Sequence, residues 1–128
     1  MKRVTGIGGV FFKARDPEHL KAWYVRHLGL PSRPDGDVVF EWHEGEEPDR
    51  QGATVWSPFP RDTNYFDPSQ SPFMINYRVA DLAGLLAQLR REGVEVEDRI
   101  EEYPYGRFAW IMDPEGNRVE LWEPPEKY

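Results

Sequence analysis

The sequence predicts an α+β domain of two tandem βαβββ modules, because one order of elements occurs twice at an offset of about 65 to 68 positions. The repeated segments, written as pairs, are 16–22 with 81–87, 40–42 with 108–110, and 53–58 with 119–124. We therefore expect a single domain over residues 1–128, with modules at about 4–60 and 72–124 related by a pseudo-twofold axis.

The first module begins with a predicted strand and helix. Residues 5–14 are rich in Gly, Val and Phe, which is typical of a strand with a close backbone approach. Asp16 can cap a helix whose first turn holds Pro17, and Gly29 ends that helix. Helical spacing predicts one buried stripe of side chains, made of Leu20, Trp23, Tyr24, His27 and Leu28.

The second module repeats this pattern more clearly. Its helix has an apolar stripe and ends at Gly93; the stripe consists of Leu82, Leu85, Leu86 and Leu89. Residues 108–112 and 118–123 then read as two strands. The intervening segment 113–117, Asp-Pro-Glu-Gly-Asn, has the composition of a turn and predicts a hairpin.

Composition excludes several classes of protein. The chain has no cysteine, which excludes disulfide scaffolds, cysteine zinc sites and thiol nucleophiles. A net charge of -7 argues against binding to nucleic acid. No apolar run approaches the roughly 20 residues that cross a bilayer, and the N-terminus lacks the apolar stretch of a signal peptide. We therefore expect a cytoplasmic protein without membrane contacts.

Three segments carry a resemblance to a known family. Residues 13–16 lead into the first helix, residues 28–30 close it, and residues 108–122 form the last hairpin. In this order they resemble the vicinal oxygen chelate superfamily, which includes glyoxalases, bleomycin resistance proteins and extradiol dioxygenases. The resemblance implies a curled mixed sheet around one cup, and a homodimer. It implies a fold more strongly than a function, because one fold can host many activities.

The resemblance also implies where metal ligands would lie. In metal-dependent members four symmetry-related strand positions hold the ion, and these positions correspond here to Gly9, Thr54, Met74 and Glu120. Only Glu120 is a good ligand, and one carboxylate cannot hold a divalent cation firmly. The three histidines lie outside predicted cup-facing strand positions. We expect no metal and no other cofactor, with one divalent metal at Glu120 as the alternative.

Strand alternation predicts which side chains face the cup. If Gly9 faces inward, the period of two places a set of aromatic, amide and charged side chains on the same concave face. We expect the loop 101–107 at its rim. Aromatic walls with a few polar groups suit a small, flat organic molecule. The predicted ligand-binding residues are Phe11, Lys13, Trp42, Thr54, Trp56, Met74, Asn76, Arg78, Trp110 and Trp122.

Three functional classes are compatible with this cup. The first is a protein that only binds a small molecule. The second is a metal-independent enzyme with Glu120 as the catalytic general base. The third is a metal-dependent lyase or dioxygenase in which Glu41 or His43 reaches the site beside Glu120. In the second class, the acid or an orienting group would come from Tyr65, Tyr103 or Tyr105.

Overall fold

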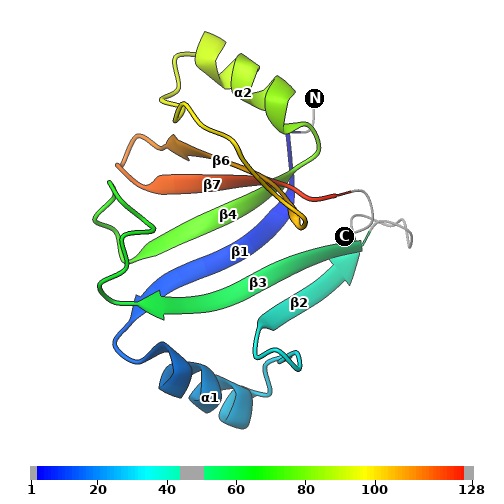
Figure 1. The fold of residues 1–128 in the computed structure, drawn as a ribbon, viewed down its shortest axis with the longest axis vertical. Coiled ribbons are helices and arrows are strands. Elements are labelled where there is room, and N and C mark those ends of the chain that lie inside the picture. The colour runs from blue at the N-terminus through cyan, green and yellow to red at the C-terminus, as the bar shows by residue number, and fades with distance from the viewer. Residues whose placement is uncertain (1–2, 44–50, 126–128) are drawn as a thin grey trace.

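The computed structural model describes residues 3–43 and 51–125, which form a seven-stranded mixed sheet and two helices (Figure 1). The acidic segment 44–50 lies outside the described residues. In chain order the elements are β1 (Val4–Ala14), α1 (Pro17–Leu28), β2 (Val38–His43), β3 (Gln51–Pro60), β4 (Phe73–Val79), α2 (Leu82–Arg91), β5 (Glu101–Tyr103), β6 (Gly106–Met112) and β7 (Arg118–Glu123).

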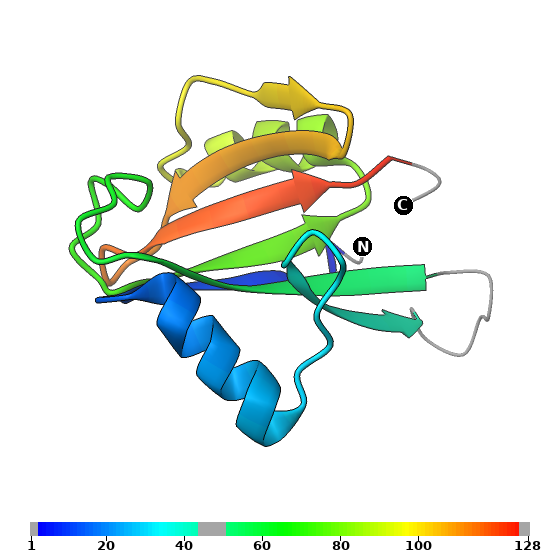
Figure 2. The ribbon, with the colours of Figure 1, turned by 60° about the horizontal axis from the view of Figure 1, so that its bottom comes forward.

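The topology confirms the predicted internal repeat. The strand order is β2-β3-β1-β4-β7-β6-β5, with β1 parallel to β3, β4 parallel to β7, and β1 antiparallel to β4 at the centre. The second module is a strand, a helix and three strands. Among the described residues the first module has two strands after its helix, plus a single bridge between Ser32 and Val38. Figure 2 shows the sheet curling from the first module into the second.

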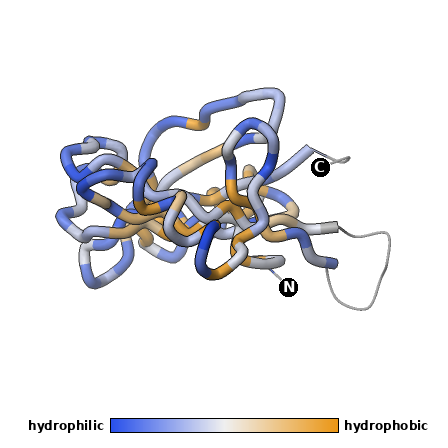
Figure 3. Tube along the Cα trace, turned by 90° about the horizontal axis from the view of Figure 1, so that it is seen from below, coloured by the Kyte–Doolittle hydropathy of each residue, from blue (hydrophilic) through white to orange (hydrophobic). Residues whose placement is uncertain are grey.

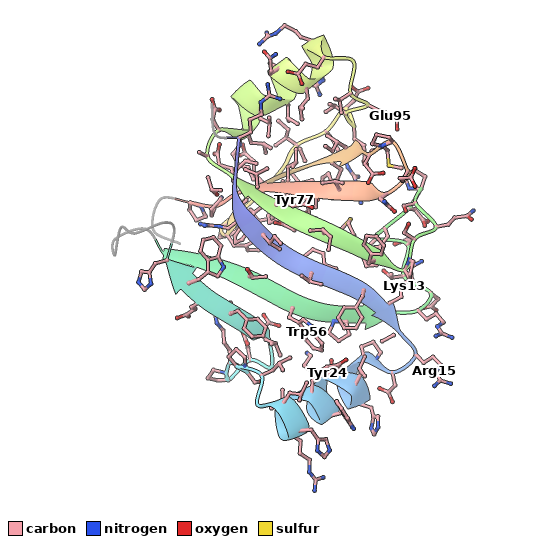
Figure 4. The ribbon with its side chains drawn as sticks, turned by 180° about the vertical axis from the view of Figure 1, so that it is seen from behind. Lys13, Arg15, Tyr24, Trp56, Tyr77 and Glu95 are labelled. Carbon is pink, nitrogen blue, oxygen red and sulfur yellow. The ribbon has the colours of Figure 1, made fainter. Side chains whose placement is uncertain are left out.

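Helix α1 begins and ends as the sequence predicts. The Asp16 carboxylate accepts a hydrogen bond from the His19 amide at 3.1 Å, and Gly29 has a φ of 65° at the C-terminus. The predicted burial of its stripe is wrong, however. No residue of α1 is buried within the chain, and Leu28 is 63 % exposed. The helix contacts the sheet through Tyr24, whose ring lies 4.9 Å from that of Trp56 (Figure 4).

Helix α2 is packed much more completely. Leu82, Leu85 and Leu86 are buried in one apolar cluster with Val79 and Leu121 of the sheet. Apolar residues concentrate along the strands, whereas hydrophilic residues dominate the outer loops (Figure 3). Neither of the two described helices is long or apolar enough to span a membrane.

A second apolar cluster lies on the other face of the sheet. It consists of Phe66, Met74 and Trp110, against which Phe11 and Phe108 pack. Phe66 belongs to the segment that joins the two modules, and it has no exposed surface. The joining segment is therefore part of the core on the face that carries the cup.

The burial of α2 gives a stability test. Leu86→Ala should lower the free energy of unfolding by about 2–5 kcal/mol, because it leaves a cavity between α2 and the sheet. The control Ile100→Ala removes a side chain that is 39 % exposed and should change this free energy by about 0.5 kcal/mol or less. Urea unfolding followed by circular dichroism measures both. Equal losses would contradict the burial of Leu86 between α2 and the sheet.

Candidate functional site

A cavity of about 320 Å³ opens on the face of the sheet opposite the helices. This volume is within the usual range for sites that hold small molecules. Most of its lining side chains are aromatic, and two are carboxylates. The lining residues are Gly8, Phe11, Val55, Phe59, Tyr65, Asn76, Glu101, Tyr103, Tyr105, Phe108, Glu120 and Trp122.

Glu120 of β7 lies on the floor of the cavity and is 1 % exposed. Three neutral donors surround its carboxylate. The Asn76 amide donates to Oε2 at 2.6 Å, the Trp110 indole donates to Oε1 at 3.1 Å, and the Tyr65 hydroxyl also donates to Oε1. The donors come from β4, β6 and the segment that joins the modules, so tertiary structure alone assembles this arrangement.

Burial dominates the ionisation of this cluster. It raises the pKa of Glu120 above its ordinary value, against the opposing effect of hydrogen bonds from Tyr65, Asn76 and Trp110. Burial, followed by the nearby Glu120 carboxylate, also raises the pKa of Tyr65. The Tyr65 hydroxyl therefore stays protonated, and serves as a donor to Glu120.

Arg118 holds the Tyr65 segment in place. Its Nη1 donates to the Tyr65 carbonyl at 2.6 Å, while Nε and Nη2 donate to the Glu97 carboxylate at 2.7 and 2.8 Å. The guanidinium also lies 4.7 Å from the centre of the Trp110 ring. Its hydrogen bond lowers the pKa of Glu97. One buried arginine thus positions two of the three groups that donate to Glu120.

Asn76 has one polar atom that the protein leaves unsatisfied. Its Oδ1 is buried and has no hydrogen-bond partner among the described residues, although its Nδ2 bonds Glu120. The backbone of residue 8 packs closely against this atom, which requires glycine there: a Cβ would lie 2.3 Å from Asn76 Oδ1 and 2.7 Å from Trp122 Cε3. An unsatisfied buried acceptor costs about 1–3 kcal/mol.

Four aromatic side chains form a wall of the cavity. Phe108 and Trp122 are stacked at 6.0 Å, and Tyr103 and Tyr105 are stacked at 5.1 Å, with both tyrosines packing edge-on against Phe108. The Trp122 indole donates to the Tyr105 carbonyl at 2.8 Å, which fixes the rim to β7. Gly106 permits this turn, because its φ is 134° and a Cβ would lie 2.3 Å from Trp122 Nε1.

The structure brings several predicted site residues together. Phe11, Asn76, Glu120 and Trp122 all line the cavity. The rim formed by residues 101–107 lies where the sequence indicates, with three of its side chains in the lining.

Other predicted site residues support the cavity or flank it without lining it. Met74 and Trp110 are buried beneath the lining aromatic side chains, in the cluster with Phe66. Lys13 Nζ lies 5.7 Å from the centre of the Phe66 ring. The guanidinium of Arg78 lies 5.7 Å from the centre of the Trp122 ring.

The inward orientation predicted for Trp56 is wrong. Its ring packs on Phe12 and Tyr24, so it faces α1 on the opposite side of the sheet. Val55 and Phe59 line the cavity from the same strand. The residues of β3 predicted to face the cup were therefore displaced by one position. In a strand, a shift of one residue exchanges the two faces.

Trp42 and Thr54 lie away from the cavity lining, next to the central strand. The Trp42 indole donates to Thr54 Oγ1 at 2.8 Å, and Thr54 donates in turn to the Ile7 carbonyl. The Trp42 ring covers Gly6 and Gly52, where a Cβ would lie 2.4 and 2.3 Å from it. These two side chains tie β2 and β3 to β1.

The strand register does not bring together the four residues that the resemblance indicated as metal-ligand positions. Gly9 lies opposite Val55 on β3 and opposite Asn76 on β4, and Asn76 lies opposite Glu120 on β7. The neighbouring positions are therefore Gly9, Val55, Asn76 and Glu120, with neither Thr54 nor Met74 among them. An irregularity between Ile7 and Gly9 shifts the pairing of β1 with β4, and the sequence pattern does not reveal it.

Only two of the residues at these four positions carry a side-chain atom that could bind a metal ion. Glycine and valine offer no ligand atom, whereas Asn76 and Glu120 are hydrogen-bonded to each other. Glu41 pairs with Arg33 at 3.4 Å on the edge strand β2, and His43 ends that strand, so neither approaches Glu120. The described residues contain no group of three or more His, Cys, Asp or Glu side chains arranged to hold a metal ion.

Sequence reasoning missed part of the lining. Gly8, Val55, Phe59 and Phe108 were not among the predicted site residues, yet they line the cavity. Had the inward positions of β3 been placed one residue later, they would have included Val55 and Phe59, because both lie on the same face of the strand. No comparable local signal marks Gly8, because the irregularity in β1 depends on its pairing with β4.

Comparisons with known proteins agree with the architecture. Methylmalonyl-CoA epimerase from Mycobacterium tuberculosis superposes with a TM-score of 0.64 at 22% identity, covering 99% of this chain and 93% of that chain. A variant of the Streptomyces coelicolor epimerase, in complex with 2-nitronate-propionyl-CoA, gives a TM-score of 0.67 at 16% identity, with coverages of 94% and 98%. A search of curated protein sequences found no match.

The family follows from the sequence match, since such low identities to solved structures show the fold alone. Residues 9–122 match the family described as "Glyoxalase-like domain", which covers nearly the whole chain and includes every strand and helix except the first residues of β1 and the last residue of β7. The resemblance to the vicinal oxygen chelate superfamily is thereby confirmed. The chain belongs to the glyoxalase-like domain family of that superfamily.

Proposed function

We propose that this protein binds a small planar organic molecule in the cavity, without a metal. The observation that carries the proposal is the combination of stacked aromatic walls with a polar floor made by Asn76 and Glu120. Aromatic faces hold a flat molecule by stacking, and a few polar atoms at one end fix its orientation. Methylmalonyl-CoA epimerase structures with bound ligands support a small-molecule role for this fold.

The arrangement favours binding over general-base catalysis by Glu120. A general base needs a free lone pair within hydrogen-bond reach of the proton that it removes. Of the roughly four acceptor sites on the Glu120 carboxylate, three take hydrogen bonds from Tyr65, Trp110 and Asn76, and the side chain is 1 % exposed. We therefore assign Glu120 a structural role at the floor of the cavity, where it orients Asn76.

We also propose that the protein acts as a homodimer. Helix α1 contains no residue buried within the chain, and Trp23 and Leu28 are 47 % and 63 % exposed. An apolar stripe of this kind is costly in water, and a second copy of the chain would cover it.

Filling the cavity tests the binding proposal. Val55→Trp should abolish binding of benzamide, a neutral planar probe, because the larger ring occupies the space that the ligand needs. The matched control Val4→Trp places the same side chain on an exposed position, 42 % accessible, outside the cavity and should bind normally. Isothermal titration calorimetry measures binding, and thermal unfolding verifies that both variants are folded. Unchanged binding to folded Val55→Trp would place the binding site elsewhere.

Metal analysis tests the absence of a metal from the site. Protein purified without chelators should contain far less than one zinc, iron, nickel or manganese ion per chain, since a single carboxylate leaves such an ion mostly hydrated. Elemental analysis gives the content, and EDTA treatment should leave the Tm and benzamide binding unchanged. A stoichiometric metal that is lost in Glu120→Gln would instead support the lyase or dioxygenase alternative.

Light scattering after gel filtration tests the dimer. The expected mass is twice the chain mass of 15.0 kDa. Trp23→Glu should produce monomers, because it places a charge on the exposed stripe of α1, whereas Glu18→Gln on the same helix should not. A wild-type mass of one chain at micromolar concentration would contradict the proposal.

A further inference from the structure

The face of the sheet that carries the helices is open between them. Helices α1 and α2 lie at opposite ends of the sheet, and the central strands β1 and β4 run between them (Figure 1). On this face the two strands present six aliphatic and aromatic side chains in three cross-strand pairs, none of which is buried within the chain. The pairs are Ile7 with Tyr77, Val10 with Ile75, and Phe12 with Phe73.

Two contacts fix the direction in which these side chains point. Tyr77 packs against the apolar cluster beneath α2, and the Phe12 ring packs on Trp56, which faces α1. Directly opposed residues of an antiparallel pair share a face, so their partners point the same way. The intervening residues Met74 and Asn76 of β4 point to the cavity side and are buried. The apolar side of the central strands is therefore the side that the chain leaves uncovered.

This surface continues onto α1 through a row of neighbouring rings. The centre of the Trp56 ring lies 5.1 Å from that of Phe12 and 4.9 Å from that of Tyr24. Tyr24 in turn lies 5.2 Å from Trp23, which is 47 % exposed. The strands and the helix thus form one continuous surface, which we call the open face. It consists of Ile7, Val10, Phe12, Trp23, Tyr24, Trp56, Phe73, Ile75 and Tyr77.

The open face carries no charge on any of its residues, all of which the structure describes. The charged residues of β1 and β4 are Lys13 and Arg78, and each lies 5.7 Å from a ring on the cavity side, that of Phe66 and that of Trp122 respectively. A charged partner would lose the hydration of its charges here without gaining an ion pair. An uncharged face suits an equally uncharged one, and a second copy of the chain supplies it by twofold symmetry.

The size of the open face requires that strands and helix be buried together. Strands β3, β1 and β4 span roughly 14 Å, and six residues of each roughly 20 Å, which gives an outline of about 300 Å². A stable dimer buries about 800 Å² of accessible surface on each partner, so the sheet alone is too small. Helix α1, about 18 Å long and 10 Å wide, adds about 180 Å² of outline. Protruding side chains and a polar rim supply the remainder.

We infer, on the basis of the homodimer proposed above, that two copies of the chain associate through their open faces, sheet against sheet, with α1 at the side of the same interface. Apolar sheet faces pack about 10 Å apart in this manner. The cavity lies on the other face of the sheet and is lined by residues of one chain. The two cavities of the dimer therefore open in opposite directions, and each is complete without the partner.

Charged substitutions on the open face test this inference by light scattering after gel filtration. Phe73→Glu and Ile7→Glu alter side chains that are 40 % and 47 % exposed in the single chain, so both variants should fold. In the dimer each would bury an unpaired charge, which should weaken association at least about 100-fold and yield monomers. Ile100→Glu is the matched control, since its side chain is 39 % exposed and lies outside the open face and the cavity lining. Thermal unfolding verifies that all three are folded.

An introduced cysteine locates the interface independently, because the chain has none of its own. Ile7→Cys should react with N-ethylmaleimide at least about 10-fold more slowly in the dimer than in the Trp23→Glu background, where the open face is exposed to solvent. Ile100→Cys should react equally fast in both backgrounds. Monomeric Phe73→Glu should bind benzamide within about twofold of the wild-type protein, because the substitution lies on the face opposite the cavity.

The outcomes separate this inference from the homodimer on which it rests. A wild-type mass of one chain would overturn both, and would leave the open face to a different partner. A dimeric wild type whose folded Phe73→Glu and Ile7→Glu variants remain dimeric would overturn the open face as the interface, while the homodimer would stand. Equal labelling of Ile7→Cys in both backgrounds would do the same. Loss of benzamide binding in the folded monomers would overturn the assignment of a complete cavity to each chain.

Discussion

The structure depends on the burial of one carboxylate in the middle of a sheet. Glu120 is 1 % exposed, and a buried carboxylate is tolerated only when donors surround it. Tyr65, Asn76 and Trp110 supply those donors from three separate segments of the chain. The joining segment, β4 and β6 must therefore keep fixed positions around β7. Arg118 enforces this by binding the Tyr65 carbonyl and packing on Trp110.

The two modules contribute different kinds of residue to the site. The second module supplies the polar floor at Asn76 and Glu120, while the equivalent strand positions of the first module are Gly9 and Val55. The Phe11 ring fills the space over Gly9, where a Cβ would lie 2.6 Å from it, and Val55 lines the cavity. The epimerase structures share this architecture at 15–22% identity, yet the chemistry of a site depends on its own side chains, which here lack a metal-binding set among the residues that the structure describes.

Local and periodic signals in the sequence determined the architecture. The repeat predicted both modules, Asp16 marked the start of the first helix, and the turn at 113–117 marked the last hairpin. Each of these features depends on residues close together in the chain, or on a simple period. The same alternation placed Asn76 and Glu120 on one face, because their strands are regular and adjacent.

Tertiary structure alone decided the details that depend on pairing between distant strands. The irregularity between Ile7 and Gly9 sets the register of β1 against β4, and Val55 rather than Trp56 enters the cavity. A strand has a period of two, so an error of one residue moves a side chain to the other face. The contact of Tyr65 with Glu120 spans 55 positions, and no local pattern encodes it. The sequence by itself thus determined the fold, whereas the pairing of the strands determined the site.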